Sequence, residues 1–406
     1  SLKIWTLLSW TFLTLGIMLG SIWAYYELGW GGFWFWDPVE NVSLMPWLAL
    51  TALVHSIIIL EKRNIFHSWT LVLAIISFTL SMNGTFLVRS GILNSVHTFA
   101  NDPERGLYIL TFLFILIFLS LIIFYIFQPK KTVKKNFFIF SREVGISINN
   151  WFMMFFLTVV FIGTIYPIIL DVLKDIRISV GSPFFTITML PLLIPFLVFM
   201  TIGPKMNWIN TKFNILLKEL IYPFLISLIL VSIIYLYFDE TKLFGYLIFL
   251  FGLFLLITLV KDVLLFFKKK QKINFPKIIS HFGFGLLVVS ISLNSIFSVE
   301  KDINLKIGES YKFDKYELKF KNISERIDKN YTSVIGNFEL LNKNGKSFIL
   351  NPEIRIFNQP KILTSEASIK TNFLHDKFLV MAFIENSEFY NIRFQYKPLM
   401  IWIWIS

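Results

Sequence analysis

The chain has 406 residues, of which 55% are hydrophobic and 16% are charged, and its mean hydropathy is +0.66. Soluble domains carry about 25% charged residues, so the composition excludes a water-soluble protein and indicates a polytopic membrane protein. The net charge of +12 does not indicate nucleic-acid binding, because the basic residues fall on alternate loops instead of forming one patch. The chain has no Cys, which excludes disulfides and thiolate chemistry of its own.

The hydrophobic residues are grouped in segments of roughly 18 to 23 residues, each long enough to cross a bilayer core of about 30 Å. An all-α bundle is predicted over residues 1–297, with nine complete spans at 4–24, 42–60, 69–87, 107–127, 149–170, 184–203, 220–238, 243–260 and 278–297. Residues 397–406 resemble the start of another span but are too few to cross. Because the chain also begins with Ser1 instead of Met, we expect it to be a fragment of a longer protein.

The basic residues of the loops predict the orientation of the bundle. Sixteen Lys and Arg lie on one set of alternate loops, and five lie on the short opposite loops. By the positive-inside rule, the loops at 25–41 and 88–106 therefore face the outside. In a bacterium this is the periplasm, and we expect a protein of the bacterial inner membrane; the same topology also suits the mitochondrial inner membrane.

Residues 298–396 have a different composition, with charged residues, Asn and alternating apolar positions in place of continuous apolar runs. Three segments alternate with period two, at 316–320, 334–341 and 347–357. Asn344-Gly345 between the last two is a strong hairpin signal. The predicted fold class is thus an all-α polytopic membrane bundle with a small external, antiparallel β domain that is tethered by a span at each end.

The first external loop, residues 25–41, is called the aromatic loop below, because seven of the twelve residues from Tyr25 to Trp36 carry rings. Its glycines let the backbone approach a ligand closely, and its rings offer flat apolar faces for stacking. Aromatic residues also collect in membrane-interface belts, but the density of rings and the glycine pair favour a site for a large, flat, apolar ligand. The candidate ligand-binding residues are Trp30, Gly31, Gly32, Phe33, Trp34, Trp36 and Asp37.

The acidic residues after the rings have a structural interpretation as well. Asp37, Pro38 and Glu40 directly precede a span. Asp-x-x-Glu with Pro at the first helical position is a helix-start signature. Helix capping is therefore the first interpretation of both acids.

Five histidines occur, at positions 55, 67, 97, 281 and 375, and two of them lie inside predicted spans. At 1.5 Å per residue, His55 lies roughly 20 Å and His281 roughly 24 Å below the outer surface. Ionisable side chains at that depth usually face a partner or a cofactor. Two neutral imidazoles at one depth on antiparallel helices can ligate a single haem iron, and Gly283 and Gly285 would let a porphyrin edge approach. Hydrogen-bonded packing is the alternative for each histidine alone.

His97 lies in the second external loop, which faces the same compartment as the aromatic loop. It is a candidate ligand of an externally bound haem iron. Arg89 and Arg105 are candidates to pair with haem propionates through charge-assisted hydrogen bonds. A polar loop residue without a ligand is an equally good interpretation of His97.

The motifs resemble those of a known family. Residues 30–41 resemble the tryptophan-rich haem-handling (WWD) motif of cytochrome c biogenesis proteins. In combination with residues 86–97 and 102–106, they are similar to the cytochrome c maturation protein F family. The resemblance continues through residues 182–185, the span with His281, and residues 298–302 and 396–398, and so covers essentially the whole chain.

The resemblance implies a haem lyase, which accepts haem from a periplasmic haem chaperone and attaches it through two thioether bonds to the Cys-x-x-Cys-His site of apocytochrome c. It implies that His97 is the catalytic residue and one of two external ligands of the transferred haem. It also implies that His55 and His281 ligate a permanent haem b within the membrane. Other membrane subunits of cytochrome c maturation are implied as partners, and quinol is implied as a candidate electron donor.

Two departures from the family pattern are visible. The second external histidine of the family lies upstream of the matched region and has no counterpart here, so His97 lacks its expected axial partner. The tryptophan that usually follows the paired glycines is Phe33, which keeps a ring but loses an indole hydrogen-bond donor. The first departure leads us to expect that the isolated chain lacks full activity.

Two functions of other classes remain open. A transporter would move haem or another amphiphile past the intramembrane histidines, although transporters commonly contain internal repeats and none is visible here. A structural assembly subunit would use its β domain only to dock partners.

Overall fold

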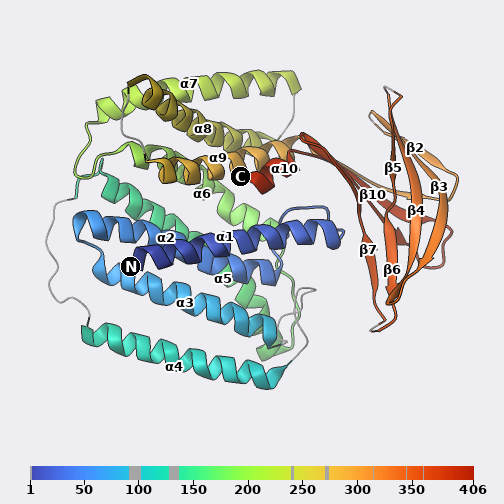
Figure 1. Cartoon of the computed structure of the whole chain (residues 1–406), viewed down its shortest axis with the longest axis horizontal. Helices are drawn as coiled ribbons and strands as arrows, with labels where there is room; N and C mark the ends of the chain where they lie inside the picture. The colour runs from blue at the N-terminus through green and yellow to red at the C-terminus, as the bar shows by residue number, and fades with distance from the viewer. Residues whose placement is uncertain are drawn as a thin grey trace. The chain divides into compact units, whose positions relative to one another are not determined.

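The computed structural model describes residues 2–90, 102–127, 137–238, 242–269, 274–313, 315–343, 345–359 and 361–406. Within these ranges nine helices are long and apolar enough to cross a membrane (Figure 1). They are α1 (Leu2–Glu27), α2 (Pro38–Arg63), α3 (His67–Arg89), α4 (Pro103–Phe127), α5 (Arg142–Lys174), α6 (Ser182–Ile202), α7 (Phe213–Phe238), α8 (Leu243–Lys269) and α9 (Phe275–Phe297). Each corresponds to one of the predicted spans, so the protein is a multi-pass membrane protein and the predicted helical bundle is confirmed.

The chain forms two compact units. Unit 1 comprises Ser1–Met18, Trp34–Leu230 and Ile257–Ile273, and unit 2 comprises Leu19–Phe33, Val231–Leu256 and Asn274–Ser406. Helices α1, α7 and α8 contribute residues to both. The aromatic loop therefore begins in unit 2 and ends in unit 1, and its two halves are described separately below.

In unit 1, α2 is the central helix. It packs against α3 and α5. In the apolar 18-residue stretch of α2, 56% of the residues are buried, compared with 6% in the corresponding stretch of α4. Gly84 of α3 lies beside Val42, where an added Cβ would be 3.4 Å from the Val42 carbonyl oxygen. Because α2 is held on more than one side, residues attached to its first turn have a fixed support.

Unit 2 contains a β domain of two antiparallel sheets (Figure 1). Its strands are β1 (Val299–Leu305), β2 (Ser310–Phe313), β3 (Tyr316–Ile327), β4 (Tyr331–Asn342), β5 (Ser347–Leu350), β6 (Glu353–Phe357), β7 (Leu363–Glu366), β8 (Ser368–Thr371), β9 (His375–Phe383) and β10 (Tyr390–Pro398). One sheet has the order β1-β10-β9-β8; the other has the order β2-β3-β4-β6-β7, with β5 also paired to β4. Apolar side chains from both sheets form one core, so the predicted antiparallel β domain is confirmed.

The hairpin region shows one difference from the predicted strands. Strands β4 and β5 pair as expected, and Gly345 in their connection has a φ of 75°. The strand predicted at 347–357, however, is divided into β5 and β6, which pair with different parts of β4. The physical reason is Pro352, which has no N–H to donate to the ladder and whose carbonyl accepts a hydrogen bond from the Gly336 N–H (2.9 Å).

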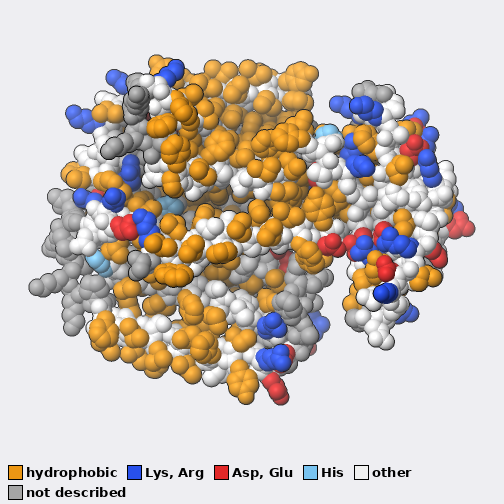
Figure 2. Space-filling model, in the orientation of Figure 1, with side chains coloured by type: hydrophobic (Ala, Val, Ile, Leu, Met, Phe, Trp, Pro, Cys, Tyr) orange, Lys and Arg blue, Asp and Glu red, His pale blue; other side chains and the backbone are white. Residues whose placement is uncertain are grey.

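The β domain is continuous with helices of unit 2 at both of its ends. α9 runs into β1, and β10 leads to the short helix α10 (Met400–Ile405), which packs on α9. The Asn294 amide of α9 donates to the Pro398 carbonyl (2.6 Å). In Figure 2, hydrophobic side chains cover the helices, whereas charged side chains gather over the strands and at helix ends.

Candidate functional site

The second half of the aromatic loop, residues 34–37, is held by the first turn of α2. Asp37 is the N-cap of the helix, and its side chain accepts a hydrogen bond from the Val39 N–H (2.9 Å). In return, Glu40 Oε2 accepts from the backbone N–H groups of Asp37 (3.1 Å) and Phe35 (2.8 Å). This is a complete capping box, so the structural role predicted for both acids is confirmed.

The Trp36 ring has a defined support. Its backbone has a φ of 59°, and its ring stacks on Phe185 at a centroid distance of 4.3 Å and an interplanar angle of 9°. Phe185 lies in the first turn of α6 and is fully buried. Gly163 of α5 makes room for it, because a Cβ there would lie 2.7 Å from the Phe185 ring. The orientation of Trp36 is therefore set by two helices that follow it by more than a hundred residues.

The indole N–H of Trp34 is a second feature of this half of the loop. Its ring meets the Trp36 ring edge-on at 6.1 Å. Its Nε1 atom is buried and has no hydrogen-bond partner among the described residues. Buried donors are nearly always paired in folded proteins, so this N–H is suited to a ligand with an acceptor oxygen.

The first half of the loop lies in unit 2 and depends on glycine at two positions. Gly29 and Gly31 are buried and have φ values of 63° and 77°, in the left-handed region that favours glycine. A Cβ on Gly29 would lie 2.5 Å from the Ser365 carbonyl oxygen, and a Cβ on Gly31 would overlap the Gln395 side-chain amide. Glycine is required at position 29 by both backbone conformation and space, and at position 31 by backbone conformation, with the Gln395 amide as its close neighbour.

Further contacts hold this half of the loop to the β domain and to α1. Arg393 Nη2 donates to the Gly29 carbonyl (3.2 Å). The Ser21 hydroxyl donates to the Phe33 carbonyl, and the Phe33 side chain packs against an apolar cluster that includes Tyr25. Trp30 is half-buried. Several of the predicted ligand-binding positions are thereby fixed in place, while their contact with a ligand stays a prediction.

A buried polar pair lies beneath this segment. The Tyr25 hydroxyl donates to Asp376 Oδ2 (3.1 Å), and the two residues are 0% and 1% exposed. Burial raises the pKa of Asp376 to about 6, although hydrogen bonds from Tyr25 and Thr371 oppose the shift. Lys397, the cross-strand partner of Asp376, has its pKa lowered by burial.

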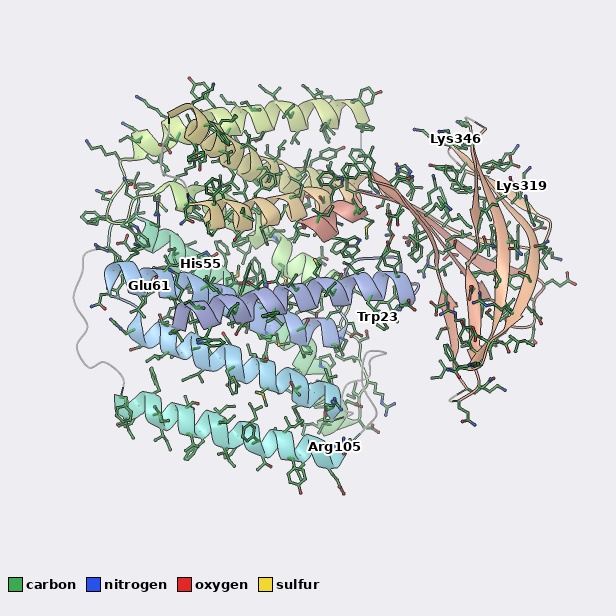
Figure 3. All side chains as sticks on the ribbon, viewed as in Figure 1. Trp23, His55, Glu61, Arg105, Lys319 and Lys346 are labelled. Atoms are coloured by element: carbon green, nitrogen blue, oxygen red, sulfur yellow. The ribbon has the colours of Figure 1, made fainter. Side chains whose placement is uncertain are left out.

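The two intramembrane histidines have the same tautomer. His55 Nδ1 lies 2.8 Å from the Thr51 carbonyl oxygen in unit 1, and His281 Nδ1 lies 2.8 Å from the Lys277 carbonyl oxygen in unit 2. A carbonyl oxygen only accepts, so each Nδ1 carries the proton and each Nε2 carries the lone pair that a metal requires. Figure 3 shows His55 on α2.

The depth of each histidine can be measured along its own helix. His55 lies about 17 residues after the start of α2, or roughly 26 Å, and His281 lies about 16 residues before the end of α9, or roughly 24 Å. Gly285 is a packing position, because a Cβ there would lie 2.9 Å from the Leu256 side chain. Gly283 lies beside the Ser406 backbone, at 3.3 Å from an added Cβ.

His97 lies outside the described residues, but the helix ends that flank its loop are described. Ser90, the C-cap of α3, and Gly106 of α4 lie close together, because a Cβ on Gly106 would be 3.1 Å from Ser90 Cα. Arg89 is exposed at the end of α3. Arg105, exposed in the first turn of α4 (Figure 3), pairs with Asp102 at 3.1 Å. Both arginines are thus brought to the two ends of one loop.

Sequence reasoning missed four residues that shape this region. Phe185 was included only in a stretch of family resemblance, and Asp376, Arg393 and Gln395 were not singled out within the predicted β domain. A weak signal was present in the run Phe378 to Met381, which has no polar position, whereas a strand with one solvent-facing side would alternate apolar and polar residues.

Comparisons with known proteins address the same regions. The family model described as cytochrome C assembly protein matches residues 1–93, and the model described as CcmF C-terminal beta-sandwich matches residues 296–398. Over 99% of its length, the chain is 36% identical to the cytochrome c-type biogenesis protein CcmF of Pseudomonas aeruginosa, and over 98% it is 35% identical to that of Escherichia coli. A solved structure, the cytochrome c heme lyase CcmF, matches 99% of the chain with a TM-score of 0.76 and 25% identity.

The chain spans 63% and 62% of the two relatives and 63% of the solved chain. The nine helices, the β-sandwich and the two matched regions define a multi-pass membrane protein of cytochrome c assembly. The chain belongs to the CcmF family of cytochrome c-type biogenesis proteins. The family inferred from the tryptophan-rich motif is thereby confirmed.

Proposed function

We propose that the chain acts in a cytochrome c haem lyase, which binds haem at the outer face of the membrane and attaches it to apocytochrome c. The observation that carries the proposal is the supported aromatic loop in a chain of this family. Trp36 stacks on Phe185, and the buried Trp34 N–H has no acceptor among the described residues. A flat apolar face beside an unsatisfied donor suits a porphyrin with oxygen-bearing substituents.

The residues of the loop would act by positioning. The chain has no Cys, so both thiols come from apocytochrome c, and each thioether forms by addition of a thiol across a vinyl group without a leaving group. His97 would ligate the iron of the substrate haem, and Arg89 and Arg105 at the two ends of that loop would pair with its propionates. Holding the vinyl edge in one place converts an encounter into an oriented reaction, which is the main source of rate in such a mechanism.

A second, permanent haem would be held within the membrane by His55 and His281. The donor set suits it, because each Nδ1 is engaged with a carbonyl oxygen of its own helix and each Nε2 carries a lone pair. When bound, this haem b would supply electron transfer, with quinol as the donor. The backbone hydrogen bonds would hold each imidazole in the tautomer that ligation requires.

The partners follow from the same proposal. They are a periplasmic haem chaperone that delivers haem, apocytochrome c that receives it, and the other membrane subunits of cytochrome c maturation. The location would be the bacterial inner membrane, with the aromatic loop and the β domain in the periplasm. The +12 net charge is then explained by inner loops that contact anionic lipid.

Substitutions in the full-length protein test the two haem assignments separately. His55→Ala or His281→Ala is expected to abolish a stable b-type absorption spectrum of the purified protein. His97→Ala is expected to keep this spectrum and to stop covalent attachment of haem to apocytochrome c. His67→Ala, at the start of α3, is the matched control and should change neither. Normal cytochrome c formation in His97→Ala would overturn the lyase assignment, and an unchanged spectrum in His55→Ala would overturn the membrane haem.

A further inference from the structure

Strand β9 is buried on both faces from Asp376 to Met381. Leu379 and Met381 belong to the core between the two sheets, whereas Phe378 and Val380 pack in a separate cluster with Tyr25 of α1. In antiparallel sheets one face commonly meets solvent. In unit 2 that face of β9 is covered by the end of α1, by α9 and α10, and by the start of the aromatic loop.

Two polar side chains of these strands bind the covering segment. Asp376 of β9 accepts the hydrogen bond of the Tyr25 hydroxyl, and Arg393 of β10 donates to the Gly29 carbonyl. Arg393 Nη2 reaches a backbone atom of the loop, so the contact fixes the path of the chain rather than one ring. Charge-assisted hydrogen bonds of this kind are among the stronger ones in proteins.

Gln395 makes a different contact, by occupying space. It is 4% exposed, and its amide lies where a side chain on Gly31 would otherwise be. Its Oε1 atom has no hydrogen-bond partner among the described residues. A hydrogen bond to this oxygen therefore does not explain the position of the amide. The contact that the amide does make is with the backbone of Gly31.

We propose that β9 and β10 form a clamp for the aromatic loop, in which Asp376, Arg393 and Gln395 are positioning residues for haem attachment. This inference rests on the proposed lyase function. The clamp fixes the backbone between Leu28 and Phe33, so that Trp30 and Phe33 are presented in one arrangement. The β domain then contributes to haem attachment by holding the loop, in addition to any docking of partners.

A matched pair of glycines tests the clamp in the full-length protein. Gly31 and Gly345 have nearly the same φ, 77° and 75°, but a Cβ on Gly345 meets nothing within 4 Å. Gly31→Ala is expected to lower covalent haem attachment per molecule of folded protein by about 10- to 100-fold, as expected for displacement of a positioned group. Gly345→Ala carries the same backbone strain and should leave attachment unchanged.

The double substitution Gly31→Ala/Gln395→Ala provides the decisive comparison. Removal of the amide makes room for the new methyl group, so most of the lost attachment should return, while the backbone strain remains. A purely structural effect would lower the amount of folded protein and the unfolding temperature together with attachment. Equal losses in Gly31→Ala and Gly345→Ala, or no recovery in the double variant, would overturn the clamp.

A second readout does not depend on activity. The chain has no Cys, so one cysteine in place of Gly32, in a full-length protein without other cysteines, reports loop fixation through its rate of maleimide labelling. Arg393→Met should raise this rate about 10-fold, whereas Arg393→Lys should retain a slow rate. Arg326→Met, an exposed arginine of β3 that pairs with Glu353, is the matched control and should not change it. An unchanged rate in Arg393→Met would overturn the clamp even if Gly31→Ala failed to fold.

The two proposals fail in different ways. If His97→Ala still forms cytochrome c, the lyase assignment is wrong, and the labelling experiment continues to test the clamp. If His97→Ala stops cytochrome c formation but Gly31→Ala does not, the lyase assignment stands and the positioning role of β9 and β10 is wrong.

Discussion

The two halves of the aromatic loop are held by different kinds of contact. Residues 34–37 are tied to the helix that follows at once, through the capping box of Asp37 and Glu40. The preceding half is tied to strands far along the chain, because Tyr25 and Gly29 bind residues 351 and 364 positions later. The backbone of one half is therefore held by local sequence, although its Trp36 ring also depends on Phe185, whereas the other half depends on contacts with the β domain.

This difference teaches how a membrane protein can present a rigid surface outside the bilayer. A capping box stabilises a helix start by about 1 kcal/mol, which alone would leave a glycine-rich segment mobile. Long-range contacts remove that freedom where Gly29 and Gly31 would otherwise allow many conformations. Each half of the loop is thus held within its own unit by the kind of contact that its sequence allows.

The largest expected effect concerns the ring beneath Trp36. Phe185→Ala removes a fully buried side chain and its stacking contact, which should cost ~3–5 kcal/mol of stability. The measurement is the unfolding temperature or denaturant midpoint of the protein in detergent. Phe184→Ala, a neighbour that is 39% exposed, is the control and should cost much less. Similar losses of stability in both variants would show that the contact between Phe185 and Trp36 does not contribute more to stability than an ordinary half-exposed ring.

The hydrogen bond beneath the other half of the loop should have a smaller effect. Tyr25→Phe removes one of the hydrogen-bond donors to the buried Asp376 carboxyl, at a cost of roughly 1–3 kcal/mol. Tyr108→Phe, on an exposed tyrosine of α4, should change the unfolding midpoint little. If the two substitutions have equal effects, the buried pair does not hold α1 to the β domain.

Removal of the local cap should have a modest effect on stability. Asp37→Ala loses the hydrogen bond to the Val39 N–H and should cost about 1 kcal/mol. Asn274→Ala removes the cap of α9, at a similar cost. The comparison becomes sharper in an assay of haem attachment, where only Asp37→Ala should reduce the yield. A reduction of the same size in Asn274→Ala would assign the effect to stability alone.

The last expected effect is a pH dependence of stability. Burial raises the pKa of Asp376 from 3.8 to about 6, so the folded protein binds this proton more tightly than the unfolded chain. The carboxyl therefore stabilises the fold less as the pH rises through the window from about 4 to about 6. Relative to Asp376→Asn, the wild-type unfolding temperature should fall across that window. The exposed Asp328→Asn variant should follow the wild type, and a parallel course of Asp376→Asn and wild type would contradict the assignment.

The elements that sequence analysis predicted well are those with a local or periodic signal. Long apolar runs gave the nine spans, period-two alternation gave the β domain, and Asp37-Pro38-x-Glu40 gave the start of α2. The division of the strand at Pro352 also had a local cause that could have been read from the residue itself. In each case the signal is carried by residues that are a few positions apart.

The sequence by itself determined the membrane class, the family and the aromatic character of the loop, because composition, periodicity and short-range hydrogen bonding are written in neighbouring residues. Only the tertiary structure decided that Phe185 supports Trp36, that Gln395 occupies the space beside Gly31, and that Asp376 meets Tyr25. Contacts between residues more than a hundred positions apart leave no period or spacing in one sequence. Folding alone brings them together.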